Sequence, residues 1–126
     1  MKKNRASGRS ESGVHREYFR DGKPACVGRY VKGEKSGVWK YYLRNGVIRA
    51  CGKFAHDRMT GTWRLYRENG RLWQVGRFEN DRKVGVWKRY HEGGELYDVG
   101  AYAEGEKTGV WKVYDAKGVL RQTRKY

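Results

Sequence analysis

The chain has 126 residues, enough for one domain, and its 29 Lys and Arg against 14 Asp and Glu give a net charge of +15. Only 37% of the residues are hydrophobic and 34% are charged, which excludes a conventional core of aliphatic side chains and leaves aromatic residues to supply the apolar contacts. No apolar run approaches the roughly 20 residues of a membrane helix, and no apolar segment follows the basic N-terminus as in a secretory signal. We therefore expect a cytoplasmic protein.

A short basic tail over residues 1–12, which we expect to be disordered, precedes a phrase that recurs every 24 residues. The phrase reads GVHREY in its first copy, and the four later copies have the form G-V/T-W-K/R-x-Y. The copies begin at Gly13, Gly37, Gly61, Gly85 and Gly109. No insertion breaks this register, so residues 13–126 are predicted to form five units of one repeat architecture.

The unit from Gly37 to Thr60 shows what each repeat is expected to form. Residues 38–43 are rich in aromatic and β-branched side chains, which favour a strand, and residues 44–46 (Arg-Asn-Gly) supply a turn. Residues 47–55 predict a second strand, and residues 56–58 a turn back. Five such hairpins predict an all-β antiparallel meander of about ten strands, in an elongated, mostly single-layer twisted sheet.

A further glycine recurs inside the second predicted strand, two residues before an aromatic residue. Because glycine has no side chain, it leaves room for a bulky ring from the adjacent strand to lie over the backbone. We expect the motif tryptophans to fill these places as a ladder. The predicted structural core comprises Trp39, Trp63, Trp87, Trp111, Gly52, Gly76 and Gly100.

Strand alternation assigns the remaining side chains to faces. Trp39 and Tyr42 are three residues apart and so lie on opposite faces, unless a bulge intervenes. In the second predicted strand of this unit, residues 47–55, alternation places Ile48, Gly52 and Phe54 on one face. The basic residue after each tryptophan should then share a face with the motif tyrosine. The candidate partner-binding residues are Lys40, Tyr42, Arg64, Tyr66, Lys88, Tyr90, Lys112 and Tyr114.

The repeated phrases resemble the MORN-repeat variant of bacterial proteins, whose units read G-x-W-x-x-Y, then N-G, then G-x-aromatic. Gly37, Trp39, Tyr42, Asn45, Gly46, Gly52 and Phe54 match this pattern, and the resemblance covers residues 13–126. It implies a β-hairpin repeat sheet without cofactor or catalytic residues. Some members are labelled antitoxins of toxin–antitoxin pairs, and MORN repeats more broadly are linked to scaffolding and lipid association.

The positive charge leaves several kinds of partner open. It could serve solubility alone, since a single-layer sheet needs charge against edge-to-edge association. A protein partner with an acidic surface would suit a basic sheet, whereas nucleic acid would use Lys and Arg on phosphates and exposed tyrosines for stacking. An anionic membrane is a weaker alternative, and exposed edges would permit a homodimer. The fourth unit interrupts the basic character with five acidic and three basic residues.

Residues with catalytic potential are few and show no pattern. His15, His56 and His91 pair with no repeated carboxylate or cysteine and are expected to be exposed and solvated. Cys26 and Cys51 are 25 residues apart, one more than the period, which places them on opposite faces and disfavours a disulfide or shared zinc site. We therefore predict no catalytic residues, no metal, no cofactor and no enzymatic activity. The sequence favours an interaction module that binds a protein partner, with nucleic-acid binding as the alternative.

Overall fold

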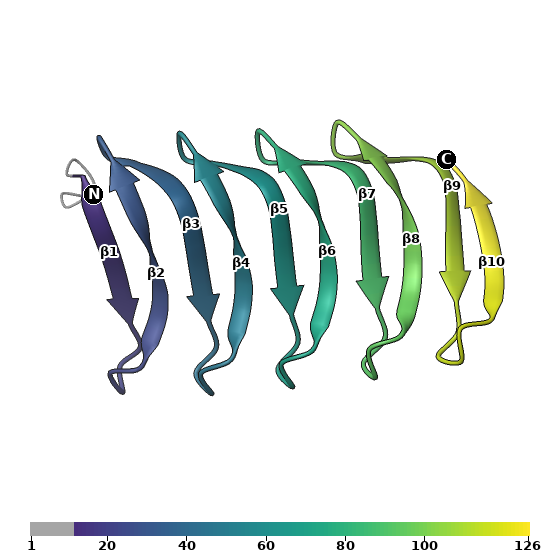
Figure 1. The fold of residues 1–126 in the computed structure, drawn as a ribbon, viewed down its shortest axis with the longest axis horizontal. Coiled ribbons are helices and arrows are strands. Elements are labelled where there is room, and N and C mark those ends of the chain that lie inside the picture. The colour runs from purple at the N-terminus through teal and green to yellow at the C-terminus, as the bar shows by residue number, and fades with distance from the viewer. Residues whose placement is uncertain (1–11) are drawn as a thin grey trace.

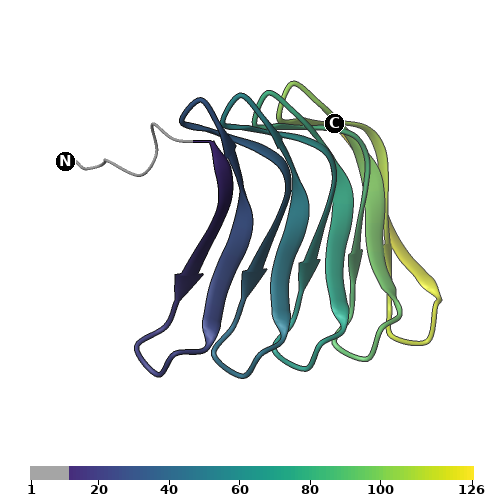
Figure 2. The ribbon, with the colours of Figure 1, turned by 60° about the vertical axis from the view of Figure 1, so that its left-hand side comes forward.

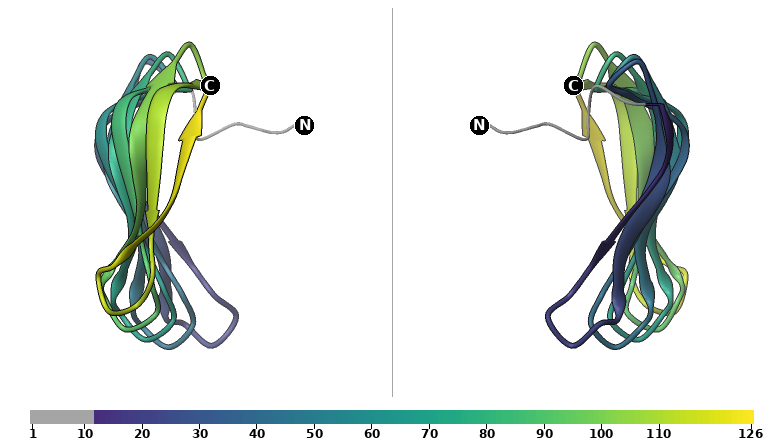
Figure 3. Two further views of the ribbon diagram at one scale, coloured as in Figure 1. Left: turned by 90° about the vertical axis from the view of Figure 1, so that its right-hand side faces the viewer. Right: turned by 90° about the vertical axis from the view of Figure 1, so that its left-hand side faces the viewer.

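The computed structural model describes residues 12–126, in which ten antiparallel strands form one sheet in the order of the sequence (Figure 1). An end-on view shows a single layer that bends near both ends of its strands (Figure 3). The strands are β1 (Gly13–Tyr18), β2 (Pro24–Val31), β3 (Glu34–Tyr42), β4 (Ile48–Ala55), β5 (Arg58–Tyr66), β6 (Leu72–Glu79), β7 (Arg82–Tyr90), β8 (Leu96–Ala103), β9 (Glu106–Tyr114) and β10 (Leu120–Lys125). The predicted all-β hairpin meander is confirmed.

The predicted disordered tail lies outside the described residues except for Ser12. The Ser12 hydroxyl accepts a hydrogen bond of 2.9 Å from the backbone N–H of Lys32, in the turn between β2 and β3.

Each hairpin closes through a turn with glycine in the left-handed conformation. In the second hairpin, the N–H of Gly46 donates to Leu43 O (2.9 Å), and the N–H of Leu43 donates to Val47 O (2.8 Å). Gly46 has a φ of 89°, which costs glycine little because it has no Cβ. The Asn45 side chain accepts a hydrogen bond from Val47 N (3.0 Å), so the predicted turn residues act as expected.

Successive hairpins are joined by two-residue turns that bend over one end of the sheet (Figure 2). His56 and Asp57 have φ values of 51° and 66°, as a type I′ turn requires. The prediction that Arg58 belongs to this turn is wrong, because Arg58 begins β5 and pairs with Ala55. The Asp57 carboxylate accepts a hydrogen bond from Lys35 N (2.8 Å), which ties the turn to the preceding unit.

The ladder between successive hairpins is interrupted at the internal glycine. Between β4 and β5, Cys51 pairs with Arg64 and Lys53 with Thr60, so the three residues 61–63 lie opposite Gly52 alone. Gly61 begins this bulge with a φ of 69°. The same shift occurs between β2 and β3, β6 and β7, and β8 and β9. Each interruption leaves backbone groups of the earlier strand without a ladder partner.

The motif tryptophan fills each interruption. An ideal Cβ on Gly52 would lie 2.0 Å from Cδ2 of Trp63, so the indole occupies the space that any other residue would need. The indole N–H donates a hydrogen bond of 3.0 Å to Lys53 O, next to the glycine. The four motif tryptophans are only 1–2% exposed. The predicted ladder is confirmed in the pairs Gly28 with Trp39, Gly52 with Trp63, Gly76 with Trp87, and Gly100 with Trp111.

The tryptophans alternate with the aromatic residues of the second strands to form one continuous core. Neighbouring rings meet edge to face at centroid distances of 5.1–6.2 Å. The order is Tyr30, Trp39, Phe54, Trp63, Phe78, Trp87, Tyr102, Trp111 and Tyr126. Each edge-to-face pair contributes about 0.5–1.5 kcal/mol beyond the area that it buries.

A bulge inside every hairpin corrects the predicted faces. Tyr41 pairs with Ala50 and Tyr42 with Ile48, so Arg49 is an extra residue in β4. Paired residues share a face, and therefore Ile48 lies on the face of Tyr42 rather than with Gly52 and the tryptophan. The prediction that Ile48 shares a face with Gly52 is wrong. The equivalent extra residues are Ala25, Trp73, Tyr97 and Arg121.

The substitution Gly76→Val should destabilise the sheet by about 3 kcal/mol or more, because a Cβ there would lie 2.0 Å from the Trp87 ring. The matched control Gly105→Asn lies in a turn where the nearest atom to a Cβ is 3.8 Å away. Aspartate already occupies the equivalent turn position at Asp57 and Asp81 with positive φ, so the control should change stability by less than about 1 kcal/mol. Urea unfolding measures the stability of both variants, and equal losses of stability would contradict the packing of Trp87 over Gly76.

Candidate interaction surfaces

One face of the sheet carries an unbroken row in which basic residues alternate with apolar or small ones. The row crosses all ten strands through direct register pairs, for example Lys40 with Cys51 and Cys51 with Arg64. Its basic members are exposed and are two strands apart, about 9.6 Å at about 4.8 Å per strand. The row is Arg16, Val27, Lys40, Cys51, Arg64, Val75, Lys88, Val99, Lys112 and Thr123.

A second basic row lies beside the first on the same face, which we call the basic face. Its basic residues come from the even-numbered strands, two positions beyond the apolar members of the first row. They are Arg29, Lys53, Arg77 and Lys125, all exposed, with Ala101 in the fourth unit. Neither row contains an acidic residue, and within residues 12–126 none of these basic side chains forms an ion pair. The positive charge of this face is therefore available to a partner.

The four predicted tyrosines are the last residues of β3, β5, β7 and β9, strands whose arrowheads lie at the lower side of the sheet in Figure 1. Tyr42, Tyr66, Tyr90 and Tyr114 are half-buried, whereas Lys40, Arg64, Lys88 and Lys112 are exposed. The register places each tyrosine on the basic face, paired with the aliphatic residue after the turn, as Tyr42 with Ile48. Tyr66 also lines a hollow that contains Trp63, so the tyrosines are less cleanly confined to one face than alternation predicts.

The opposite face, which we call the tryptophan face, carries cations over the aromatic core. Lys83 Nζ lies 4.7 Å from the centroid of the Trp87 ring and 5.0 Å from that of Tyr102. Burial, followed by the nearby Arg89 and Lys107, lowers the pKa of Lys83. Lys35 and Lys107 take equivalent positions over Trp39 and Trp111. In the third hairpin, Met59 occupies this position in β5.

Next to the tryptophans, the same face holds residues that differ from unit to unit. Arg89 and Asp98 form a two-pronged ion pair, with Nη2–Oδ2 and Nε–Oδ1 distances of 2.6 and 3.1 Å. The Asp98 side chain is only 4% exposed, and its hydrogen bonds raise the pKa of Arg89. At the corresponding pair in the first hairpin, the Cys26 thiol donates to Glu17 (3.0 Å).

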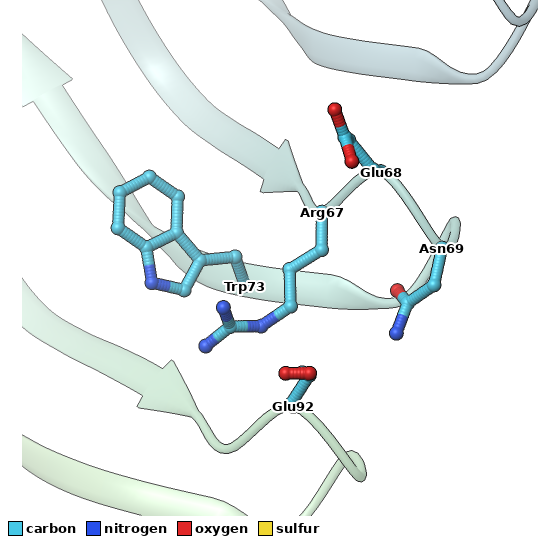
Figure 4. Close-up of a pocket in the computed structure, with 5 residues that line it drawn as sticks. All are labelled: Arg67, Glu68, Asn69, Trp73 and Glu92. Carbon is cyan, nitrogen blue, oxygen red and sulfur yellow. The ribbon is translucent and has the colours of Figure 1, made fainter.

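Two hollows meet at Trp73, the tryptophan outside the repeated motif. One has a volume of about 470 Å³ and is lined by Arg67, Glu68, Asn69, Trp73 and Glu92 (Figure 4). The other has a volume of about 370 Å³ and is lined mainly by apolar residues of the second and third hairpins. In Figure 4 the Arg67 side chain extends between Trp73 and Asn69, with Glu92 beyond it. Its Nη2 donates to Tyr90 O (2.8 Å).

The histidines take three different structural roles. The predicted exposed state holds for His56, whose side chain is 87% exposed and contacts Glu34 at 3.1 Å. It is wrong for His91, whose Nε2 lies 2.8 Å from Tyr114 O, and for His15, whose ring packs on Tyr30 at 5.1 Å. Over residues 12–126, no cluster of three His, Cys, Asp or Glu side chains is placed to hold a metal, and no helix could cross a membrane.

The family model described as MORN repeat variant matches residues 107–126, which comprise most of the fifth hairpin. This chain contains a MORN repeat. The four preceding hairpins share the strand pairing of the fifth, and a tryptophan packed over a glycine joins each pair of neighbours, so all five hairpins have the architecture of the matched one. The resemblance inferred from the sequence is thereby supported.

Comparison with whole proteins adds little to the MORN assignment. The chain is similar to one chain of the structure titled "Crystal structure of GtfA/B complex bound to UDP and GlcNAc", with 13% identity and a TM-score of 0.33. The similarity covers 90% of this chain and 24% of that one, so this chain spans about a quarter of its length. No curated protein matches the sequence.

Sequence reasoning missed the cations on the tryptophan face and the exposed Trp73. The signal for the cations was present, since Lys35, Lys83 and Lys107 recur with the 24-residue period of the MORN-type units. Trp73 could have been noticed because it alone among the five tryptophans lies outside the motif. The position of its side chain, however, depends on the bulge between β5 and β6, and this bulge leaves the 24-residue spacing of the motif unchanged.

The Cys26 thiol should be unreactive in the folded protein. Burial and the hydrogen bond to Glu17 raise its pKa to about 12, so very little thiolate exists at pH 8. In a Cys51→Ser variant, iodoacetamide should modify Cys26 roughly a hundredfold or more slowly in the folded state than in urea. Mass spectrometry follows the reaction, and comparable rates in both states would show that the thiol is not held as described.

Proposed function

We propose that this MORN-repeat chain is a non-enzymatic interaction module that binds a protein partner with an acidic surface through its basic face. The observation that carries the proposal is the pair of basic rows, which are exposed, contain no carboxylate and form no ion pair within residues 12–126. Complementary charge favours encounter with an acidic surface and disfavours basic partners. A rigid sheet also keeps these charges in fixed positions, which limits the ordering that binding requires.

The burial of the tyrosines favours a protein over a nucleic acid. Single-stranded nucleic acids bind with bases stacked on exposed aromatic rings, but Tyr42, Tyr66, Tyr90 and Tyr114 are half-buried. The exposed apolar residues of the basic face are mostly valines, such as Val38 and Val86, with 50% and 59% exposure. Tyr18 and Leu120, at 59% and 48% exposure near the two edges of the sheet, are the exceptions. Small apolar side chains between basic ones suit a protein surface of mixed polar and apolar character.

The residues with chemical potential support a binding role rather than catalysis. The Cys26 thiol is kept protonated, and the guanidinium of Arg89 is paired with Asp98. The resemblance to MORN-repeat variant proteins is compatible with two versions of this role, a scaffold or an antitoxin-like inhibitor. In the second version, the charge of the basic face would select an acidic target.

Charge reversal on the basic face tests the proposal. In the variant Lys40→Glu/Arg64→Glu/Lys88→Glu, binding to fluorescently labelled polyglutamate at about 0.15 M salt should weaken roughly tenfold or more. The matched control Arg20→Glu/Lys23→Glu/Lys117→Glu makes the same change of charge at exposed turn residues. It should lose much less affinity. Fluorescence anisotropy measures both proteins.

The same measurement with labelled oligothymidylate separates the alternatives. Tighter binding of the oligonucleotide than of polyglutamate, lost on Tyr66→Ala and Tyr90→Ala substitution, would favour nucleic acid and contradict the proposal. Equal losses in the face variant and the turn variant would show that net charge alone drives binding.

A further inference from the structure

The third hairpin, β5 and β6, lacks the cation that covers the aromatic core in the second, fourth and fifth hairpins. In those three hairpins, a lysine lies 4.7–5.1 Å from the centroid of the motif tryptophan. Met59 replaces that lysine in the third hairpin, and Leu65 stands where the fourth hairpin has Arg89. Two charged side chains are thus replaced by apolar ones at one place on the tryptophan face.

The result is an apolar hollow of about 370 Å³. Phe54, Met59, Leu65 and Trp73 line it, and the Trp63 ring, which is 2% exposed, lies against its base. Its volume is at the lower end of the range for ligand sites, enough for one bulky side chain. Because the residues come from neighbouring strands of a rigid sheet, the hollow is formed before any ligand binds.

The exposed Trp73 side chain suggests that the hollow contacts another protein. Trp73 is the extra residue of the bulge between β5 and β6, and its side chain remains 39% exposed. The Arg67 guanidinium lies 5.9 Å from the Trp73 ring centroid (Figure 4). Tryptophan and arginine in a partly enclosed apolar site are the residue types that dominate binding energy at protein interfaces.

We propose that this hollow binds a peptide segment of a protein partner, with one bulky aliphatic side chain inserted and an adjacent carboxylate at the rim. The charge of the rim determines the occupant, because Arg49 is the one charged residue among residues 12–126 that lines the hollow. Glu68 and Glu92 line the neighbouring hollow, and they disfavour a second carboxylate on that side.

This hollow is lined mainly by residues of the tryptophan face, with Tyr66 at its border with the basic face, and none of the Lys and Arg residues of the two basic rows lines it. A partner could therefore occupy the hollow while an acidic protein occupies the rows of Lys and Arg. The chain would then hold two proteins back to back.

Titration with blocked dipeptides tests the site. The probes are acetyl-Asp-Leu-amide, acetyl-Asp-Ala-amide and acetyl-Lys-Leu-amide, followed by ¹H–¹⁵N NMR. The Asp-Leu probe should shift the indole N–H of Trp73 and the amides of Met59 and Leu65 in a saturable manner. The Asp-Ala probe should bind roughly tenfold or more weakly, because it leaves the hollow unfilled. The Lys-Leu probe should also bind more weakly because of Arg49.

Two substitutions taken from neighbouring units should abolish these shifts without disturbing the fold. Met59→Lys restores the lysine of the other units, and Trp73→Arg introduces the residue found at the equivalent position in Arg49 and Arg121. Tyr97→Arg is the matched control, since it replaces an aromatic residue by arginine at the equivalent bulge position of the fourth unit and should leave Asp-Leu binding unchanged. Arg49→Glu should reverse the preference between the Asp-Leu and Lys-Leu probes.

The dispersion of the motif indole N–H signals reports whether each variant is folded. Unchanged binding by folded Met59→Lys or Trp73→Arg protein would overturn the proposal. So would equal binding of the Leu and Ala probes, or shifts confined to Lys40, Arg64 and their neighbours on the basic face.

Discussion

The packing of each motif indole over the glycine of the preceding unit is the contact on which the whole sheet depends. The bulge that carries Trp63 removes part of the hydrogen-bonded ladder, and the same indole donates to Lys53 O beside the gap. One side chain therefore fills the space, covers the backbone and donates a hydrogen bond to a backbone carbonyl beside the gap. Because Trp63 belongs to one unit and Gly52 to the unit before it, the contact joins neighbours rather than stabilising a hairpin alone. A hairpin of this kind is only marginally stable in isolation.

This arrangement frees both faces of the sheet from packing against a second layer. The aromatic core runs through the sheet as a single line of rings, and lysines such as Lys83 cover part of it. Residues away from that line are then constrained mainly by strand pairing. The basic face can consequently carry nine exposed Lys and Arg side chains in its two rows, and the tryptophan face can change at single positions, as at Met59, while the repeat is kept.

The sequence predicts the fold well because the glycine and tryptophan that pack together recur at a fixed spacing. A glycine such as Gly76 and its tryptophan recur every 24 residues, and both residue types have a steric reason to be there. The faces were predicted less well. The extra residue at Arg49 or Trp73 lies inside the same 24-residue period, so nothing in the spacing reveals that alternation breaks there. The Arg89–Asp98 ion pair was missed for a similar reason. The two residues face each other in the last regular pair of β7 and β8 before the bulge, and the sequence does not show where that bulge lies.

The type I′ turns between hairpins have a consequence for how such a chain can change in length. Asp57 hydrogen-bonds to Lys35 of the unit before, and Asp81 repeats the contact with Met59. The turn, the glycine–tryptophan packing and the ring pair thus all connect one unit with its immediate neighbour, as in other solenoid-like proteins. If a whole internal unit were gained or lost, the two units brought together would meet through the same turn, glycine and ring contacts as other neighbours. No new type of contact would be needed. Related chains could therefore differ in reach by one hairpin at a time, about 9.6 Å of sheet, while the basic rows remain aligned.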